Sequence, residues 1–141
     1  MNSGKGLHKM KKTIISVCLL TISIFSTPSL SKANDAEIER LMHQFFFNVS
    51  NGYGNSAVAF LTDPILSERE RQLKNNPAYA KFLRKIHANA TLRVMDIVDI
   101  NQDTKTVDVE ILHQGEAIPE KLRYVVKRDK NRWKISDEIR P

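Results

Sequence analysis

The stretch from residue 90 to residue 111, ATLRVMDIVDINQDTKTVDVEI, decides the fold of this chain. Before it, apolar residues recur every three or four positions, which is the spacing of one helix face. From Leu92 onward they alternate with polar residues, which is the spacing of a half-buried strand. This alternation predicts a strand with Leu92, Val94, Val98 and Ile100 on one face.

Three further strands are predicted after the first one. Their inward residues are Val107, Val109, Ile111 and His113 in the second, Leu122, Tyr124 and Val126 in the third, and Trp133, Ile135 and Ile139 in the fourth. Turn-forming residues at 101–103, 114–116 and 129–131 separate the strands. Because short links join antiparallel neighbours, the sequence predicts a four-stranded meander.

Helices are predicted before the sheet. A first helix, capped by Asn34 or Asp35 and ended by Gly52, carries an apolar stripe. The stripe consists of Ile38, Leu41, Met42, Phe45, Phe46 and Val49, whereas Phe47 lies off it and should meet solvent or a second surface. A short helix is expected over 55–61, a charged helix over 66–73, and a last helix from Pro77 with the stripe Tyr79, Phe82, Leu83, Ile86 and Ala90.

The predicted fold class is therefore α+β. Helical stripes must bury against one face of the sheet. We expect N-terminal helices packed in the hollow of a curved four-stranded antiparallel meander, which together form a cone.

The N-terminal residues 1–33 read as a secretory signal peptide. Lys5, Lys9, Lys11 and Lys12 precede an apolar run over 14–25, and Ser31-Lys32-Ala33 offers small residues before a cut. A retained membrane anchor is the alternative, but a spanning helix needs roughly 20 apolar residues. We expect cleavage after Ala33, a single domain over 34–141, and a periplasmic or secreted bacterial protein without a stable membrane anchor.

The net charge of +6 does not indicate a nucleic-acid partner. Five of the 22 Lys and Arg residues lie in 1–33, where there is no acid, which leaves 17 basic against 16 acidic residues. Cys18, the only cysteine, lies in the predicted signal peptide, so thiolate metal sites are excluded from the mature domain. His43, His87 and His113 fall on separate elements, and we predict neither a metal nor another cofactor.

Two groups of residues are candidates for a site. Asp96, His113 and Asp137 interrupt the apolar faces of the strands, where they could act as acid and base. A β-bulge near Met95 would instead turn Asp96 outward, and we assign no catalytic residue. Aromatic residues on the inward stripes either fill the core or line a cavity. The candidate ligand-binding residues are Phe45, Phe46, Phe82, Asp96, His113, Tyr124, Trp133 and Asp137.

The last hairpin, YVVKRDKNRWKISD at 124–137, together with helices before a curved meander, resembles the nuclear transport factor 2-like superfamily. A narrower resemblance is to periplasmic phospholipid carriers of the toluene-tolerance type. It rests on Gly115, Ile118, Pro119, Tyr124, Lys127, Asp129, Trp133, Lys134 and Asp137. Those carriers have more helix before the sheet and a further segment after it. The superfamily includes isomerase-like and dehydratase-like enzymes and assembly subunits of secretion machines, but their catalytic pattern does not map onto this chain.

These observations favour an exported, non-enzymatic binding domain. It would hold a small apolar molecule or lipid in the cone or dock a partner protein on the open sheet face. One alternative is a cone-pocket enzyme of isomerase or dehydratase type. Another is an assembly subunit of an envelope or secretion complex, with an envelope protein partner or a homodimer formed through the sheet. Basic residues Arg93, Lys121, Arg123 and Lys127 alternate on that face with Asp108 and Glu110, which predicts a solvated surface.

Overall fold

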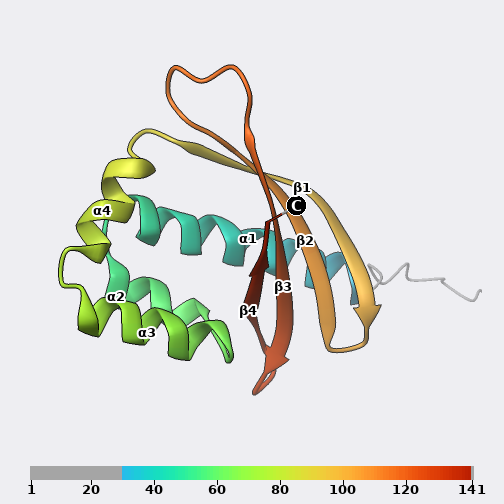
Figure 1. Cartoon of the computed structure of the whole chain (residues 1–141). Coiled ribbons are helices and arrows are strands. Elements are labelled where there is room, and N and C mark those ends of the chain that lie inside the picture. Colours follow the sequence, from blue (N-terminus) through green and yellow to red (C-terminus); the bar gives the residue numbers. More distant parts are fainter. Residues whose placement is uncertain (1–29, 141) are drawn as a thin grey trace, which may run out of the picture.

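The computed structural model describes residues 30–140, and its helices gather on one side of a curved sheet (Figure 1). The elements are α1 (Leu30–Ser50), α2 (Gly54–Ala57), the 3-10 helix η1 (Val58–Phe60), α3 (Ile65–Asn75), α4 (Tyr79–Ile86), β1 (Thr91–Asn101), β2 (Thr104–Leu112), β3 (Glu120–Asp129) and β4 (Arg132–Ile139). The predicted α+β cone is confirmed. No helix in the described part of the chain is long and apolar enough to cross a membrane.

The sheet is the predicted meander. Its strand order is β1-β2-β3-β4, and every neighbouring pair is antiparallel. In the middle of the sheet, Val109 lies opposite Val94 on one side and Leu122 on the other. Because paired residues of adjacent strands point to the same side of the sheet, the apolar residues of the strands together form one inner face, which packs against the helices.

Helix α1 supplies the helical half of the core. Its predicted stripe is confirmed: Ile38 and Met42 are fully buried, and Phe45 and Phe46 are buried with them. The sheet contributes Val107, Val109, Ile111, Leu122, Tyr124, Val126, Trp133 and Ile135 to the same cluster. Phe47, off the stripe, is 61% exposed. Burial of this apolar area is the main favourable term in folding.

The N-terminal boundary of α1 differs from the prediction. The helix begins at Leu30, so neither Asn34 nor Asp35 is its cap. Their side chains make tertiary contacts instead: Arg128 donates to Asn34 at 3.0 Å, and Lys105 donates to Asp35 at 2.6 Å. The predicted signal peptide lies mostly outside the described residues, and the predicted cleavage point after Ala33 falls within α1.

The other helix boundaries follow the sequence closely. Gly52 ends the first helical segment with a φ of +76°, as predicted. The segment predicted over 55–61 consists of α2 and η1, and the charged segment is α3. Helix α4 begins at Tyr79, two residues after Pro77, so the prediction of Pro77 as its first residue is wrong.

Three register shifts interrupt the strand pairs. One lies at the end of β1, between Asp99 and Asn101, and the other two are β-bulges that change which side chains face inward. The first bulge lies between Val94 and Asp96, where Met95 is the extra residue. Beyond it Ile97 packs against the core, while Val98 and Ile100 are 45% and 60% exposed. The prediction that these two share the inner face with Val94 is therefore wrong, because one inserted residue reverses the alternation.

The second bulge lies in β4. Val126 pairs with Ile135 and Val125 pairs with Asp137, so Ser136 is the extra residue. Ser136 is buried and donates to the Val125 carbonyl at 3.2 Å. After it, Glu138 faces inward opposite Tyr124.

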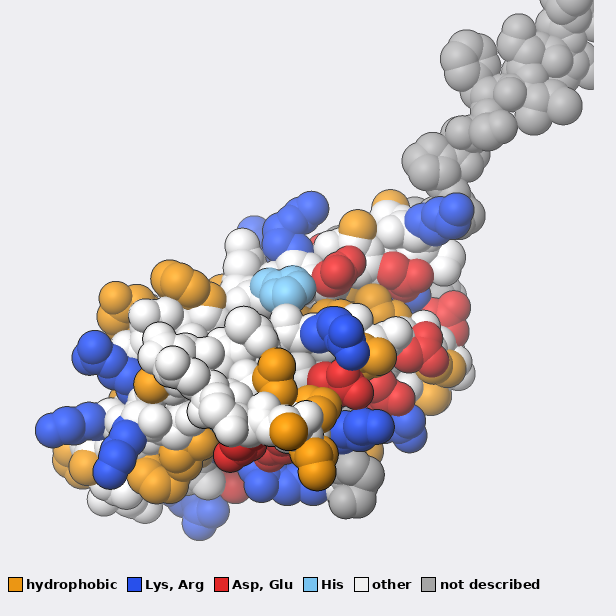
Figure 2. Space-filling view, turned by 90° about the horizontal axis from the view of Figure 1, so that it is seen from above, with side chains coloured by type: hydrophobic (Ala, Val, Ile, Leu, Met, Phe, Trp, Pro, Cys, Tyr) orange, Lys and Arg blue, Asp and Glu red, His pale blue; other side chains and the backbone are white. Residues whose placement is uncertain are grey.

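The outer face of the sheet is solvated, as predicted. Arg93 lies 2.7 Å from Glu110, and Arg123 binds Asp108 at 2.6 Å. The arginine holds the pKa of the Asp108 carboxyl below its usual value through a hydrogen bond. In the view from above, basic and acidic side chains lie next to one another on the sheet side, at the right, while the charged side chains seen over the helices, at the left, are basic (Figure 2).

Candidate functional site

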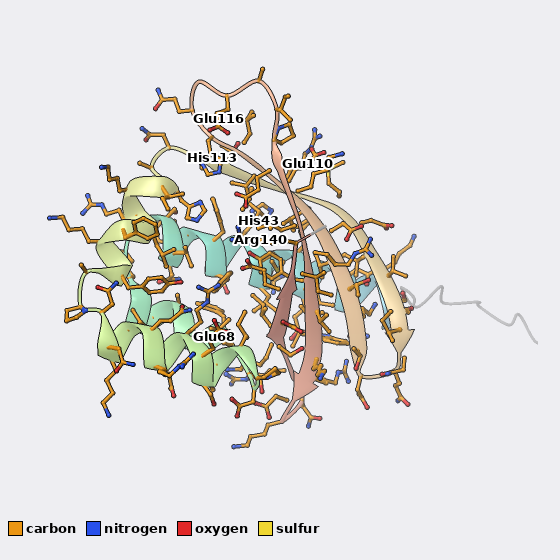
Figure 3. The ribbon with its side chains drawn as sticks, viewed as in Figure 1. His43, Glu68, Glu110, His113, Glu116 and Arg140 are labelled. Atoms are coloured by element: carbon orange, nitrogen blue, oxygen red, sulfur yellow. The ribbon has the colours of Figure 1, made fainter. Side chains whose placement is uncertain are left out.

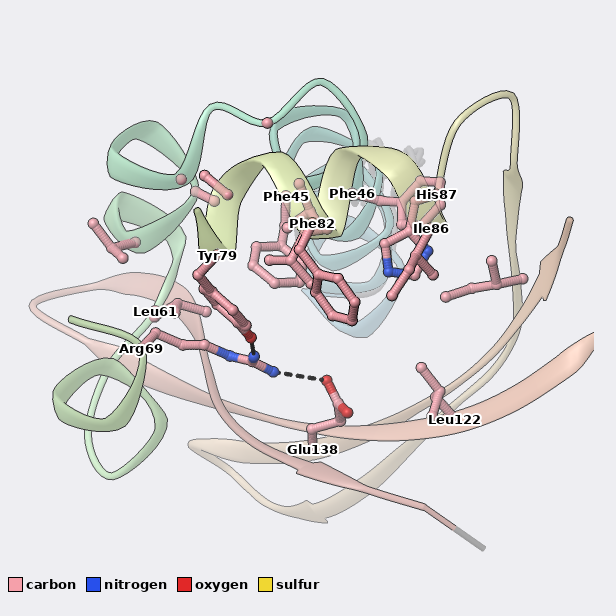
Figure 4. A pocket seen from close by; sticks show the side chains of 18 of the residues that line it. Phe45, Phe46, Leu61, Arg69, Tyr79, Phe82, Ile86, His87, Leu122 and Glu138 are labelled. Atoms are coloured by element: carbon pink, nitrogen blue, oxygen red, sulfur yellow. Dashed lines mark hydrogen bonds and ion pairs between the residues drawn. The ribbon is translucent and has the colours of Figure 1, made fainter. Parts of the chain in front are cut away.

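A pocket of about 350 Å³ lies between the helices and the inner face of the sheet (Figure 4). Its volume is at the lower end of the range for small-molecule sites, about 300–1,000 Å³. Its apolar lining includes Phe45, Phe46, Val49, Val58, Leu61, Leu73, Phe82, Leu83, Ile86, Ile111 and Leu122. A concave and mainly apolar lining with a few polar groups is the usual form of a ligand site.

An ion pair between Arg69 and Glu138 lies in the pocket lining. The closest nitrogen and oxygen are 3.3 Å apart, and the two side chains are 23% and 15% exposed. Arg69 comes from α3 and also donates to the Tyr79 hydroxyl and, at 3.2 Å, to Gln72 (Figure 4). Arg69 is therefore held in place by Gln72 and Tyr79 of the helical layer and by Glu138 of the sheet.

Tyr124 supplies a buried phenol beside this ion pair. It is opposite Glu138 in the pairing of β3 with β4. Burial raises the pKa of Tyr124, and the negative charge of Glu138 raises it further. The phenol consequently keeps its proton and is a hydrogen-bond donor in this part of the pocket.

His87 directly follows α4 and lines the pocket on the opposite side from Arg69 (Figure 4). Its ring stacks on His113 with centroids 5.5 Å apart and meets Phe46 edge-on at the same distance. Burial lowers the pKa of His87, and the neighbouring His113 lowers it further. The Nδ1 atom of His87 is buried and has no hydrogen-bond partner among residues 30–140.

His113 supports this end of the pocket through its stacking contact with His87. It follows β2 at the base of the loop that carries Glu116 (Figure 3). Its Nδ1 lies 3.2 Å from the Ile86 carbonyl and its Nε2 lies 3.4 Å from Glu120. Because a carbonyl oxygen only accepts, His113 Nδ1 donates to Ile86 and fixes the end of α4 to the sheet.

The structure brings together only part of the predicted residue set. Phe45, Phe46, Phe82 and Tyr124 line the pocket, and His113 adjoins it through His87. Trp133 is buried elsewhere, with Lys105 5.9 Å and Arg128 5.2 Å from its ring centroid.

Asp96 and Asp137 are exposed on the sheet, so their predicted inward position is wrong. The bulges at Met95 and Ser136 turn them outward, as the alternative reading of Asp96 anticipated. The acid and base set of Asp96, His113 and Asp137 is therefore not assembled.

The polar residues of the pocket were missed by the sequence analysis. They are Arg69, His87, Glu120, Glu138 and Arg140. Glu138 reaches the pocket only because of the bulge in β4. Arg69 belongs to the predicted charged helix, for which no inward-facing stripe was predicted. Within the described range, no three His, Cys, Asp or Glu side chains are grouped in a way that could hold a metal ion.

Comparisons with known proteins agree with this architecture at the level of the fold. No family model matches the sequence, and no curated protein matches it. The chain is similar to an NTF-2-like protein of unknown function from Shewanella oneidensis, with a TM-score of 0.55 and 12% identity over 74% of this chain and 95% of that one. The protein therefore has the nuclear transport factor 2-like fold, as the sequence resemblance implied.

Two other solved structures are similar with lower scores. One is a candidate scytalone dehydratase from Novosphingobium aromaticivorans, with a TM-score of 0.48 and 14% identity over 77% of this chain and 83% of that one. The other is a domain of unknown function with a cystatin-like fold from Nostoc punctiforme, with a TM-score of 0.47 and 13% identity over 75% of each chain.

Proposed function

We propose that this protein is an exported, non-enzymatic binding domain that holds a small, mainly apolar molecule in its cone. The observation that carries the proposal is the pocket, in which aromatic and aliphatic walls surround a few fixed polar groups. Burying an apolar ligand there removes its surface from water, and the polar groups orient it. A compact molecule suits this volume better than a phospholipid with two chains.

The pocket is a better candidate than the outer sheet face for the binding function. On the outer face Arg93, Arg123 and Lys121 are paired with Glu110 or Asp108, and such exposed pairs give little affinity to a partner. The enzyme alternative has no support from Asp96 and Asp137, which lie outside the cone.

A pocket-filling variant tests the binding function. Leu83 lines the pocket, so Leu83→Trp should occupy part of its volume and weaken binding of any probe that enters. Phe47→Trp, at an exposed position of α1, is the matched control and should bind as the parent does. The probes are n-decanol, decanoate and decylammonium, titrated calorimetrically into the full chain.

Each outcome of this experiment either supports or contradicts the binding function. Binding of at least one probe that is lost in Leu83→Trp and kept in Phe47→Trp supports the proposal. Equal binding by parent and Leu83→Trp, or no binding of any probe, contradicts it. Native mass spectrometry of the protein from its own host provides the second measurement, in which a co-purifying small molecule is expected.

Export is the second part of the proposal and rests on the pattern of residues 1–33. Mass analysis of the protein from the host's envelope fraction should find a chain that begins at Asn34. A full-length chain in the cytoplasmic fraction would contradict export without affecting the binding proposal.

A further inference from the structure

The charged groups that line the pocket cancel one another. The described lining contains two arginines, Arg69 and Arg140, and two acids, Glu120 and Glu138. Arg69 lies 3.3 Å from Glu138, while Arg140 lies 3.3 Å from Glu138 and 3.8 Å from Glu120. Each charge in the lining therefore already has a partner of opposite sign.

This balance disfavours an ionised ligand. A carboxylate that bound Arg69 would compete with Glu138 and place two negative charges around one guanidinium in a largely buried position. An ammonium group would meet the same difficulty at Glu138 with the signs reversed. Because an ionised ligand would disturb ion pairs that are already formed, the pocket selects against ions and in favour of uncharged molecules.

One polar atom of a lining residue has no hydrogen-bond partner in the described part of the chain. His87 Nδ1 is buried and makes no hydrogen bond within the described chain, although buried polar atoms nearly always have a partner. The His87 ring is part of the pocket wall beside Phe46 and Ile86 (Figure 4). Because Nδ1 is covered by protein atoms, a ligand in the pocket reaches it only when the His87 ring turns toward the cavity. A neutral imidazole can then present Nδ1 either as donor or as acceptor, depending on its tautomer.

We propose that the ligand is an uncharged, mainly apolar molecule with one hydroxyl or carbonyl group, and that the His87 ring turns on binding so that Nδ1 gains its missing hydrogen bond from this group. Its apolar part lies against Phe45, Phe46 and Phe82. This inference rests on the proposed binding function and adds the charge of the ligand and the position of its polar group. The lowered pKa of His87, caused by burial and then by His113, keeps the ring neutral near pH 7, in agreement with an uncharged ligand.

The three probes of equal chain length test the charge of the ligand. Calorimetric titration of the full chain at neutral pH should give n-decanol an affinity about tenfold higher than decanoate or decylammonium. If either ion binds as tightly as the alcohol, the inference is overturned, whereas the binding function stands as long as Leu83→Trp removes that binding. If no probe binds, the binding function and this inference both fail.

Variants of His87 test the position of the polar group. His87→Phe keeps an aromatic ring but removes Nδ1, and should weaken n-decanol binding about tenfold. His87→Gln supplies an amide that donates and accepts, and should bind n-decanol more tightly than His87→Phe does. His43→Phe, at an exposed site on α1, is the control and should bind as the parent does.

The variants also give a result that would overturn this contact. Parent affinity for n-decanol in both His87 variants would show that Nδ1 does not bind the ligand. Parent affinity in His87→Phe together with a loss in His87→Gln would show that the ring acts only through its shape. Circular dichroism of each variant confirms that the fold is kept before affinities are compared.

Discussion

The ammonium group of Lys105 lies 2.6 Å from Asp35 and thereby joins strand β2 to the first turns of α1. Asp99 lies 2.7 Å from the same nitrogen, and the Trp133 ring centroid is 5.9 Å away. Lys105 is only 4% exposed. Burial tends to lower its pKa, but the hydrogen bonds to both acids outweigh this effect and raise the pKa. The lysine is thus a buried cation that depends on two more exposed carboxylates.

Removing the two acids should cost more stability than removing the lysine. The double variant Asp35→Asn with Asp99→Asn leaves a buried ammonium without a counter-charge, and should lower the free energy of unfolding by about 3 kcal/mol. Lys105→Met keeps an apolar stem beside Trp133 and frees two acids that water can solvate, so it should cost about 1 kcal/mol. Urea unfolding measures both values. A larger loss in Lys105→Met than in the double variant would contradict this account.

Gly52 is predicted to be required at the end of α1 for two reasons. Its φ of +76° is unfavourable for other residues, and an added Cβ would lie 3.2 Å from the Arg84 Cβ and 3.3 Å from the Ala80 carbonyl oxygen. Gly52→Ala should therefore lower the free energy of unfolding by about 2 kcal/mol. Gly115 has a φ of +85° but nothing within 4 Å of an added Cβ, so Gly115→Ala should cost about 1 kcal/mol. Equal losses would show that the contact with α4 adds nothing.

The general fold could be predicted because two periodicities specify it. The helical stripe that includes Ile38, Met42 and Phe46 and the alternation of Val107 with Val109 each bury one side of an element, so the layers follow from the pattern. The predicted first residues of the helices were less accurate. The predicted cap Asp35 binds Lys105 instead, and this partner is 70 residues away in the sequence.

The errors in the sheet have a single physical origin. A bulge adds one residue to a strand and reverses every later position, while the sequence around it still reads as a strand. Val98 lies beyond the first bulge, and Asp137 and Ile139 lie beyond the second. The apolar wall of the pocket was accessible from the sequence because Phe45 and Phe82 lie on helices, whereas Glu138 depends on the second bulge.

His87 should make stability depend on pH. Burial and the adjacent His113 lower its pKa below the ordinary 6.5, so the unfolded chain binds more protons than the folded one as the pH falls through that region. The stability contributed by His87 is therefore full above about pH 6.5 and declines as the pH falls toward the pKa of the folded state.

Replacing this histidine should flatten the pH profile of stability. Urea unfolding of the parent between neutral pH and about pH 5 should show a decline that is smaller in His87→Gln, because glutamine does not titrate. His43→Gln, at an exposed position of α1, should keep the slope of the parent. An unchanged slope in His87→Gln would assign the decline to other groups.

Glu138 should determine the charge preference of the pocket. Glu138→Gln leaves two arginines and one acid in the described lining, so Arg69 gains a free side for an anion. We expect the affinity for decanoate to rise about tenfold, while that for n-decanol changes little. The same variant should lose about 1–2 kcal/mol of stability, because Arg69 loses its charged partner.

A matched variant separates this local effect from the overall charge of the protein. Glu116→Gln makes the same change in net charge in the exposed loop between β2 and β3 (Figure 3), far from the Arg69 ion pair in sequence and outside the pocket lining. It should leave the affinities for both probes as they are in the parent, since exposed charges are screened by solvent and salt. If Glu116→Gln raises decanoate binding as much as Glu138→Gln does, then long-range attraction accounts for the effect and the neutral balance of the pocket does not.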